Sequence, residues 1–330
     1  AGCYSKTLSQ GSMPLFGSQF QDWQMLRFPL LVLVFLAASV AAVAPAQAHE
    51  KTPDGLQLAS VNAAVAYVDG DELVFSKNAD RRVPIASVTK LMTALVVMES
   101  GQSLNEWIEF RKRHIPAPAN AYTRIRIGSE LKRGDVLRIA LMSSENFAAH
   151  TLARHYPGGY DSFVAAMNAK ARELDMDNTV FVDPTGLSVE NQASAADLVR
   201  LVVAANKHPE ISDYSTTRYF TARFRQPRYR LPFGNTNALV HRESWGVDIS
   251  KTGYLSEAGR CLVMLLEFED RQLVTVLLDS LGTRSPMGDA ARIRRWLSTG
   301  KTGAVAAAAR DYARQKNEAY STAESSASAN

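Results

Sequence analysis

The strongest constraint on the fold is a stretch from Ser87 to Met98 that is hydrophobic almost all round when it is drawn as a helix. A helix at the surface keeps a polar face, so a helix of this kind belongs in the centre of a protein. One residue in its first turn is nevertheless charged: Lys90 follows Ser87 at the spacing Ser-x-x-Lys. That spacing places an amine one helical turn from a hydroxyl, on the same face.

A buried pair of this kind predicts a nucleophile and its base. A serine hydroxyl is a poor nucleophile unless a neighbouring base takes its proton. A lysine in water has a pKa of about 10.4 and is protonated, so it cannot act as that base. Burial and a second positive charge both lower the pKa of a lysine. Lys90 can therefore activate Ser87 if the apolar residues Leu91–Met98 surround it and the fold brings another cation near.

The motif alone does not select Ser87, because Ser-x-x-Lys also starts at Ser129 and Ser298. The first of these lies in a polar segment before a glycine, and the second borders a low-complexity segment, whereas Ser87 opens the apolar helix. An ordinary reading stays open for Ser87, which could be a helix N-cap after Pro84.

Two further short motifs occur in suitable contexts. Ser144-Glu145-Asn146 lies at the junction between two predicted helices. Lys251-Thr252-Gly253 lies within a predicted strand, whereas the second Lys-Thr-Gly, at Lys301, borders the low-complexity segment. Order and context, rather than any single motif, therefore point to a site built from these three segments.

The order of predicted elements indicates an α+β fold. Alternating or apolar runs with turn residues between them predict strands over 61–68, 72–75, 107–110, 122–127, 247–254, 260–267 and 273–278. Capping residues and helical periodicity predict helices over 135–142, from 145, over 161–174, 194–207 and 287–297. Strands at both ends of the chain and helices in the middle predict an antiparallel sheet flanked by helices, with an inserted all-helical lobe.

The two ends of the chain are predicted to differ from its middle. Residues 25–48 have the pattern of a secretory signal peptide, with Arg27, an apolar run and a small-x-small site ending at Ala48. A membrane anchor is the alternative, because the run is nearly long enough to span a bilayer. The pattern predicts a periplasmic protein cleaved after Ala48, with residues 1–24 as upstream sequence. The catalytic domain is then 49–298, and the alanine- and serine-rich residues 299–330 are predicted to form a mobile tail.

Composition excludes several other classes. The chain carries 37 basic and 33 acidic residues, a mildly basic balance that suits an anionic cell wall. It shows no basic cluster interleaved with aromatics, so nucleic acid is not a predicted partner. The six histidines form no HExxH pair, and neither a metal nor another cofactor is predicted. Cys261 lies in an apolar run, which favours a buried, inert thiol over a catalytic one.

The three motifs, in this order, resemble those of penicillin-binding proteins and serine β-lactamases, with a glutamate where the usual middle motif has aspartate. Other segments resemble the low-molecular-mass D-alanyl-D-alanine endopeptidases, and the likeness covers roughly residues 55–297. These segments are Asn78-Ala79-Asp80, Pro84 to Ala94, Tyr156 to Tyr160, Asp183 to Leu187, Asn235-Thr236-Asn237 and Ala258 to Cys261. The resemblance implies the serine β-lactamase/D,D-peptidase fold.

The resemblance also implies a role for each residue of the three motifs. Ser87 attacks the carbonyl that follows a D-alanine and forms an acyl-enzyme, with Lys90 as base. Ser144 relays a proton to the leaving amine, and Asn146 holds the substrate amide. Lys251 and Thr252 bind the substrate carboxylate, and Lys251 helps to keep Lys90 neutral. Gly253 lets the substrate approach the strand, while the backbone N–H groups of Ser87 and Tyr254 form an oxyanion hole.

The implied activity is hydrolysis of D-alanyl cross-links between peptidoglycan stem peptides, with covalent inhibition by β-lactam antibiotics. The segment Ala258 to Cys261 and the absence of a second β-rich domain favour an endopeptidase over a D-alanyl-D-alanine carboxypeptidase. A β-lactamase is disfavoured because no Glu-x-x-Leu-Asn segment supplies a deacylation base. A non-turnover penicillin-binding sensor or wall-binding module stays open as an alternative of another class, as does peripheral association with the membrane or with other murein enzymes.

Overall fold

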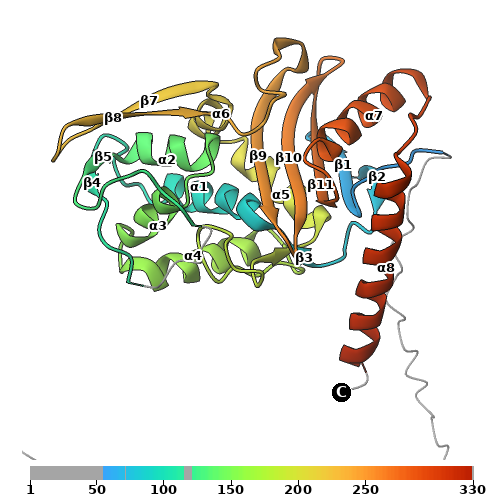
Figure 1. The fold of residues 1–330 in the computed structure, drawn as a ribbon, viewed down its shortest axis with the longest axis horizontal. Helices are drawn as coiled ribbons and strands as arrows, with labels where there is room; N and C mark the ends of the chain where they lie inside the picture. The colour runs from blue at the N-terminus through green and yellow to red at the C-terminus, as the bar shows by residue number, and fades with distance from the viewer. Residues whose placement is uncertain (1–54, 71, 115–120, 329–330) are drawn as a thin grey trace, which may run out of the picture. The chain divides into compact units, whose positions relative to one another are not determined.

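The computed structural model describes residues 55–70, 72–114 and 121–328, so the predictions for residues 1–24 and 25–48 lie outside it. An antiparallel sheet of five strands forms its centre, in the order β2-β1-β11-β10-β9 (Figure 1). These strands are β1 (Asn62–Tyr67), β2 (Leu73–Lys77), β9 (Val247–Leu255), β10 (Gly259–Phe268) and β11 (Arg271–Ser280). Asn62 lies opposite Leu278, so strands from both ends of the sequence close the sheet as predicted.

The predicted central helix is confirmed. Helix α1 (Lys90–Glu99) has eight of its ten residues buried, Lys90 among them. A short 3-10 turn, η1 (Ala86–Thr89), leads into it and carries Ser87. Four helices form the lobe around α1, and a fifth packs α1 against the sheet (Figure 1). They are α2 (Arg133–Met142), α3 (Asn146–Arg154), α4 (Gly159–Glu173), α6 (Pro209–Thr216) and, against the sheet, α5 (Ala195–Ala205).

Helices cover both faces of the sheet, and the pleat of β10 shows why. Successive side chains of a strand point to opposite faces. Val263 and Leu265 belong to the core that includes α1 and α5. Leu262 and Met264, which alternate with them, belong to a second core beneath α7 (Ser285–Thr299). Both faces of β10 are therefore covered. Strand β9 lies beside it at the edge of the sheet.

The lobe contains two small antiparallel strand pairs, and both differ from the prediction. Strand β4 (Trp107–Glu109) pairs with β5 (Glu130–Lys132), and the predicted strand over 122–127 is absent. Ile125 is buried, as the apolar–polar alternation of residues 122–127 predicts. The segment nevertheless lies beside a hairpin without adding a strand to it. Arg126 N–H instead donates to the Tyr229 hydroxyl, at 3.0 Å. That hairpin, β7 (Tyr219–Phe224) with β8 (Tyr229–Gly234), was not predicted, because Pro232 and a run of arginines mask its alternation.

The prediction of a mobile tail over 299–330 is corrected by α8 (Ala307–Ser328). Alanine is the strongest helix former, which explains the helix, and tertiary contacts hold it in place. Tyr312 and Tyr320 donate to the two carboxylate oxygens of Asp279, at 2.5 and 2.8 Å, and Lys316 Nζ lies 3.2 Å from the same side chain. Asp279 is fully buried, so α8 supplies the partners that its carboxylate needs.

We expect the double change Tyr312→Phe with Tyr320→Phe to lower the free energy of unfolding by about 3–6 kcal/mol, because each of the two lost hydrogen bonds to a buried charged group contributes about 1.5–3 kcal/mol. Chemical denaturation followed by circular dichroism measures this. Tyr219→Phe is the matched control, since the Tyr219 side chain is 77% exposed. Equal stability of the double variant and the control would show that α8 is not anchored through Asp279.

Candidate active site

Ser87 stands on a strained turn rather than at an ordinary helix cap. The N-cap residues of η1 and α1 are Ile85 and Thr89, so Ser87 does not occupy a cap position. The residue before it, Ala86, has φ +47°, a left-handed conformation that L-residues rarely adopt. Thr89 Oγ1 donates to the Ala86 carbonyl at 2.8 Å, and a side chain at Gly186 would collide with that carbonyl, with Cβ 1.9 Å from the oxygen. Strain of this kind persists only where the surroundings over-determine it, and it is common at active sites.

Lys90 is fully buried, and its amine is held by three acceptors. Lys90 Nζ donates to Ser87 Oγ at 3.0 Å, to Asn146 Oδ1 at 2.7 Å and to the Thr185 carbonyl at 2.6 Å. A protonated amine fills all three positions. A neutral amine keeps two N–H donors for Asn146 and Thr185, and its lone pair then faces the Ser87 hydroxyl. This is the arrangement that a base needs in order to take the serine proton.

The protonation of Lys90 is set by burial and by three nearby charges. Burial lowers its pKa to about 7, which leaves a large neutral fraction near neutral pH. The carboxylates of Asp183 and Glu145 oppose this shift, and the guanidinium of Arg113 adds to it. Burial also raises the pKa of Glu145, whose Oε1 accepts from Phe147 N–H and caps α3. Glu145 therefore caps α3 and also raises the pKa of Lys90, and its position in Ser-Glu-Asn predicts neither role.

Lys251 and Ser144 form a second amine–hydroxyl pair across the site. Lys251 Nζ donates to Ser144 Oγ at 3.0 Å and to the Thr252 carbonyl at 2.7 Å. Burial and the charge of Lys90 both lower the pKa of Lys251 well below the usual value. The influence is one-sided: the charge of Lys90 lowers the pKa of Lys251, whereas the cation that lowers the pKa of Lys90 is the guanidinium of Arg113. Ser144 itself has φ +58°, so this residue too is held in a strained conformation.

Strand β9 forms one wall of the site and is an edge of the sheet. The outer edge of such a strand offers backbone groups to an extended peptide. Thr252 Oγ1 lies 2.6 Å from Thr236 Oγ1, and Tyr254 is half exposed beneath the guanidinium of Arg260. A side chain at Gly253 would place its Cβ 2.9 Å from the Ile85 carbonyl and 3.2 Å from the Ser87 nitrogen. The glycine is therefore required for contact between β9 and the Ser87 turn, in addition to any approach by substrate.

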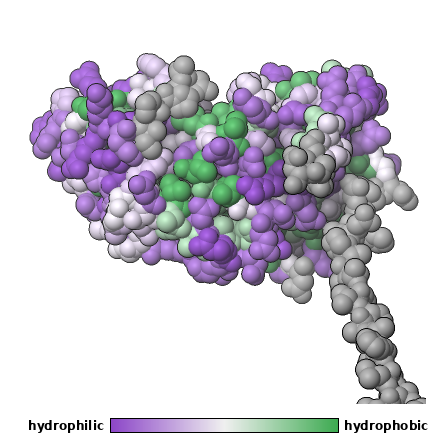
Figure 2. Space-filling model, turned by 90° about the horizontal axis from the view of Figure 1, so that it is seen from below, coloured by the Kyte–Doolittle hydropathy of each residue, from purple (hydrophilic) through white to green (hydrophobic). Residues whose placement is uncertain are grey.

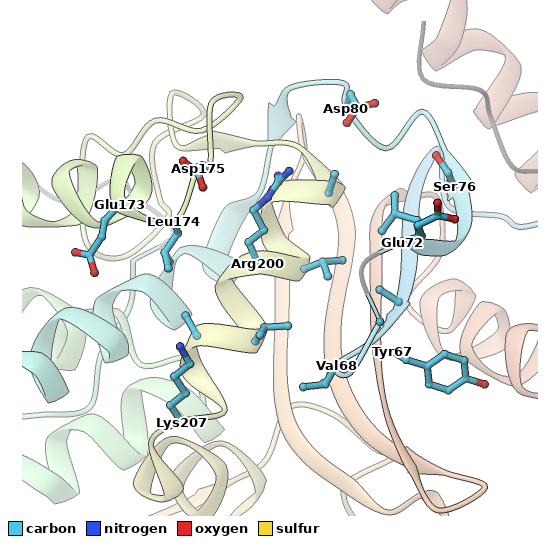
Figure 3. Close-up of a pocket in the computed structure, with 17 residues that line it drawn as sticks. Tyr67, Val68, Glu72, Ser76, Asp80, Glu173, Leu174, Asp175, Arg200 and Lys207 are labelled. Atoms are coloured by element: carbon cyan, nitrogen blue, oxygen red, sulfur yellow. The ribbon is translucent and has the colours of Figure 1, made fainter. Parts of the chain in front are cut away.

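The predicted residues meet at one cavity of about 350 Å³. Ser87, Ser144, Asn146, Thr252, Gly253 and Tyr254 line it, while the side chains of Lys90 and Lys251 lie buried beneath its wall. A larger cavity, of about 640 Å³, lies between α5 and the β1–β2 hairpin (Figure 3). Ser76 and Lys207 lie on opposite sides of that cavity, so they do not form a nucleophile–base pair. The chemistry therefore belongs to the smaller cavity.

The structure also bears on two alternatives to a serine nucleophile, namely a catalytic cysteine and a metal site. Cys261 also lines the cavity, but burial raises the pKa of its thiol to about 12, which disfavours the reactive thiolate.

Within 55–70, 72–114 and 121–328, histidine, cysteine and carboxylate side chains form no group of three or more that could hold a metal ion. Across the same ranges, no helix combines the length and apolar character that crossing a membrane requires. Hydrophobic residues do gather in the middle of the face shown in Figure 2, between hydrophilic areas.

The turn from Asp183 to Gly186 is the part of the site that motif reasoning missed. The Asp183 carboxylate accepts from Thr185 N–H and Gly186 N–H through Oδ1 and from Ser188 N–H through Oδ2. These bonds fix the Thr185 carbonyl beneath Lys90. The sequence shows the turn, but its contact with α1 spans 95 residues and has no local signature.

Comparisons with known proteins agree with this geometry. The family model described as D-alanyl-D-alanine carboxypeptidase (peptidase S11) matches residues 47–282. The chain belongs to this family. It is 43% identical to a D-alanyl-D-alanine endopeptidase of Escherichia coli, over 87% of this chain and 91% of that protein. It is 45% identical to a D-alanyl-D-alanine endopeptidase of Pseudomonas aeruginosa, over 87% of this chain and 93% of that protein.

Solved structures show the same fold. A point mutant of the Streptomyces K15 DD-transpeptidase is 25% identical, with a TM-score of 0.66, over 73% of this chain and 98% of that one. Penicillin-binding protein D2 of Listeria monocytogenes, in its ampicillin-bound form, is 28% identical, with a TM-score of 0.62, over 72% of this chain and 96% of that one. The predicted D,D-peptidase fold and family are thus confirmed, and the chain is a serine-type hydrolase of this family.

We expect the rate of acylation by a fluorescent penicillin to rise with pH through about 7 and then to level off, because only neutral Lys90 can accept the Ser87 proton. At pH 6 the rate should be about a tenth of the plateau, as one unit below a pKa implies. Stopped-flow or gel-based labelling across pH 5–9 measures this profile.

Paired charge variants check the assignment. Arg113→Gln removes a charge that lowers the pKa of Lys90, so the rising limb should move to higher pH. Glu145→Gln removes a charge that raises this pKa but keeps the oxygen that caps α3, so the limb should move to lower pH. Limbs that stay in place, or that move in the same direction in both variants, would refute Lys90 as the titrating base.

We expect Gly253→Ala to slow acylation by about a hundredfold, because its Cβ would push β9 away from the Ser87 turn and a displacement near 1 Å can cost that much. The second-order rate of penicillin labelling measures the loss. Gly303→Ala is the matched control, since its Cβ would come no nearer than 3.6 Å to a neighbouring atom. A normal rate in Gly253→Ala would show that β9 tolerates the shift.

Proposed function

We propose that this protein is a D-alanyl-D-alanine endopeptidase that hydrolyses D-alanyl cross-links in peptidoglycan through an acyl-enzyme on Ser87. The observation that carries the proposal is the buried amine of Lys90, bonded to Ser87 Oγ and held by Asn146 and Thr185. The two endopeptidases with 43% and 45% identity support the choice of substrate. The carboxypeptidases among the relatives are less similar, and the Bacillus subtilis protein has 27% identity.

The acylation step uses groups that are already in contact. Neutral Lys90 takes the proton of Ser87, and Oγ attacks the carbonyl carbon of the bond that follows a D-alanine. The backbone N–H groups of Ser87 and Tyr254 stabilise the oxyanion that forms. Collapse of the tetrahedral intermediate breaks the C–N bond and leaves the acyl group on Ser87 Oγ.

The leaving amine needs a proton, and the second amine–hydroxyl pair supplies it. Ser144 passes its hydroxyl proton to the leaving nitrogen and recovers one from Lys251, to which it is hydrogen-bonded at 3.0 Å. Lys90 then releases the proton that it took from Ser87, and Lys251 regains the one that it passed to Ser144, by exchange with solvent. Water attacks the acyl-enzyme with neutral Lys90 again as base, and Ser87 Oγ takes that proton back as its bond to the acyl carbon breaks and the second product leaves. Lys251 and Thr252 also present an ammonium and a hydroxyl toward a substrate carboxylate, while Asn146 binds the substrate amide beside the nucleophile.

We further propose that the protein acts in the periplasm after loss of residues 25–48. The support is the signal-peptide pattern in the sequence. β-Lactam antibiotics are proposed as covalent inhibitors of the same serine, and the similarity to an ampicillin-bound penicillin-binding protein supports this.

We expect a fluorescent penicillin to label the protein, and Ser87→Ala to abolish the label. Mass spectrometry of products from purified muropeptides measures the activity: cross-linked dimers should be cut to monomers faster than pentapeptide monomers lose their terminal D-alanine. Faster release of free D-alanine would identify a carboxypeptidase instead. Labelling without turnover of either substrate would identify a penicillin-binding sensor, and labelling of Ser87→Ala would refute the nucleophile.

A further inference from the structure

A second hollow, of about 460 Å³, lies on the helical lobe, where the β7–β8 hairpin turns. Four arginines line it, with three aromatic side chains. We call it the arginine hollow, and its residues are Arg223, Arg225, Arg228, Arg230, Trp107, Phe224 and Tyr229. Arg225 lies over the Trp107 ring at 4.2 Å, so the hollow has both a cationic and an aromatic wall.

Most of the positive charge in the hollow has no acidic partner. Arg225 pairs with Glu130. Among the described residues, no carboxylate lies within ion-pair distance of Arg223, Arg228 or Arg230, and all three are exposed. From Arg218 to Gly234 the sequence has five arginines and no acidic residue. The mildly basic balance of the whole chain is thus concentrated here.

Packing of the hairpin does not explain these arginines. Ala222, Phe224 and Phe233 face the core and are buried. Arg223 and Arg230 face solvent and lie directly opposite each other across the two strands. Like charges in that position destabilise a strand pair. A residue pair that costs stability and packs nothing is best explained by a ligand that neutralises it.

The chemistry of the hollow selects carboxylates or phosphates. A guanidinium offers two parallel N–H donors that match a carboxylate or phosphate, and this hairpin uses arginine throughout, without lysine. Two more exposed arginines lie beside β8. Arg124 donates to the Pro232 carbonyl at 2.7 Å, and Arg126 lies over the Tyr229 ring at 4.9 Å. The anion-binding surface therefore extends beyond a single small ion.

The other end of the hairpin adjoins the active site. The Gly234 carbonyl, at the end of β8, accepts from Ser143 Oγ at 2.6 Å, next to Ser144. Thr236 follows two residues later and lines the catalytic cavity. The six residues of β8 span about 20 Å, and an extended peptide of five residues spans about 17 Å. A single peptide bound in the cavity is therefore too short to reach the hollow, and only neighbouring peptides of a polymer can occupy it.

We propose that the arginine hollow binds carboxylates of peptidoglycan stem peptides adjacent to the cross-link that occupies the active site. This rests on the proposed function. The hollow contributes binding to polymeric wall material, while a small soluble substrate that fills only the cavity does not reach it. Its position at the far end of the hairpin whose other end adjoins the cavity favours wall carboxylates over the phosphates of a lipid surface, which need no connection to the active site.

The test is binding to purified, intact sacculi, measured by co-sedimentation over a range of NaCl concentrations. All proteins carry Ser87→Ala, so binding is read without turnover and independently of the proposed activity. Arg223→Gln, Arg228→Gln and Arg230→Gln together should weaken binding about tenfold at low salt and flatten its salt dependence. The matched control changes three exposed arginines elsewhere, Arg172→Gln, Arg295→Gln and Arg310→Gln, and should bind as the parent does.

Two further measurements decide the ligand. Sacculi whose carboxylates have been amidated should bind the parent protein as weakly as untreated sacculi bind the hollow variant. Vesicles of phosphatidylglycerol should not distinguish the hollow variant from the control. Equal binding of both triple variants to sacculi, or a loss confined to vesicles, would overturn the proposal. Penicillin labelling of the hollow variant with Ser87 intact shows that its cleft is folded.

Discussion

The rest of the site depends on one buried amine. Within the part of the chain that the structure describes, no carboxylate pairs with Lys90, and its three acceptors are a hydroxyl, an amide oxygen and a backbone carbonyl. Such a group is stable only because its pKa is lowered to about 7 and it sheds its charge readily. The helical lobe, the Asp183 turn and β9 must therefore all place their polar groups correctly around Lys90 in the folded protein.

The sequence predicted the parts of the site whose physics is local. An all-round apolar helix with a lysine in its first turn, the helix junction at Ser144 and the strand around Lys251 were enough to single out two amine–hydroxyl pairs, which the structure brings together. It did not predict the Thr185 carbonyl beneath Lys90, because that contact joins segments far apart in the chain. The helix α8 was also missed, because its anchor, Asp279, is a tertiary partner that composition cannot show.

Backbone strain is present beside both hydroxyls of the site. Ala86, next to Ser87, and Ser144 both have left-handed conformations, which cost of order 1–3 kcal/mol each. Close backbone contact at Gly186 and Gly253 holds the first of them in place. Strain at these residues lowers the stability of the fold but fixes the positions of the Ser87 and Ser144 oxygens. The pairing of Arg223 with Arg230 across β7 and β8 also lowers stability, and it places positive charge at the surface.

The closing of the sheet by β1 and β11 has a consequence for the timing of activity. Residues of the site come from η1, α3, the Asp183 turn and β9, and the sheet that orders them cannot form until the last strand, β11, is available to pair with the first. A fragment that lacks β11 therefore cannot hold the residues of the site in place. A hydrolase of this design stays inert until its whole chain has folded, without needing an inhibitory segment.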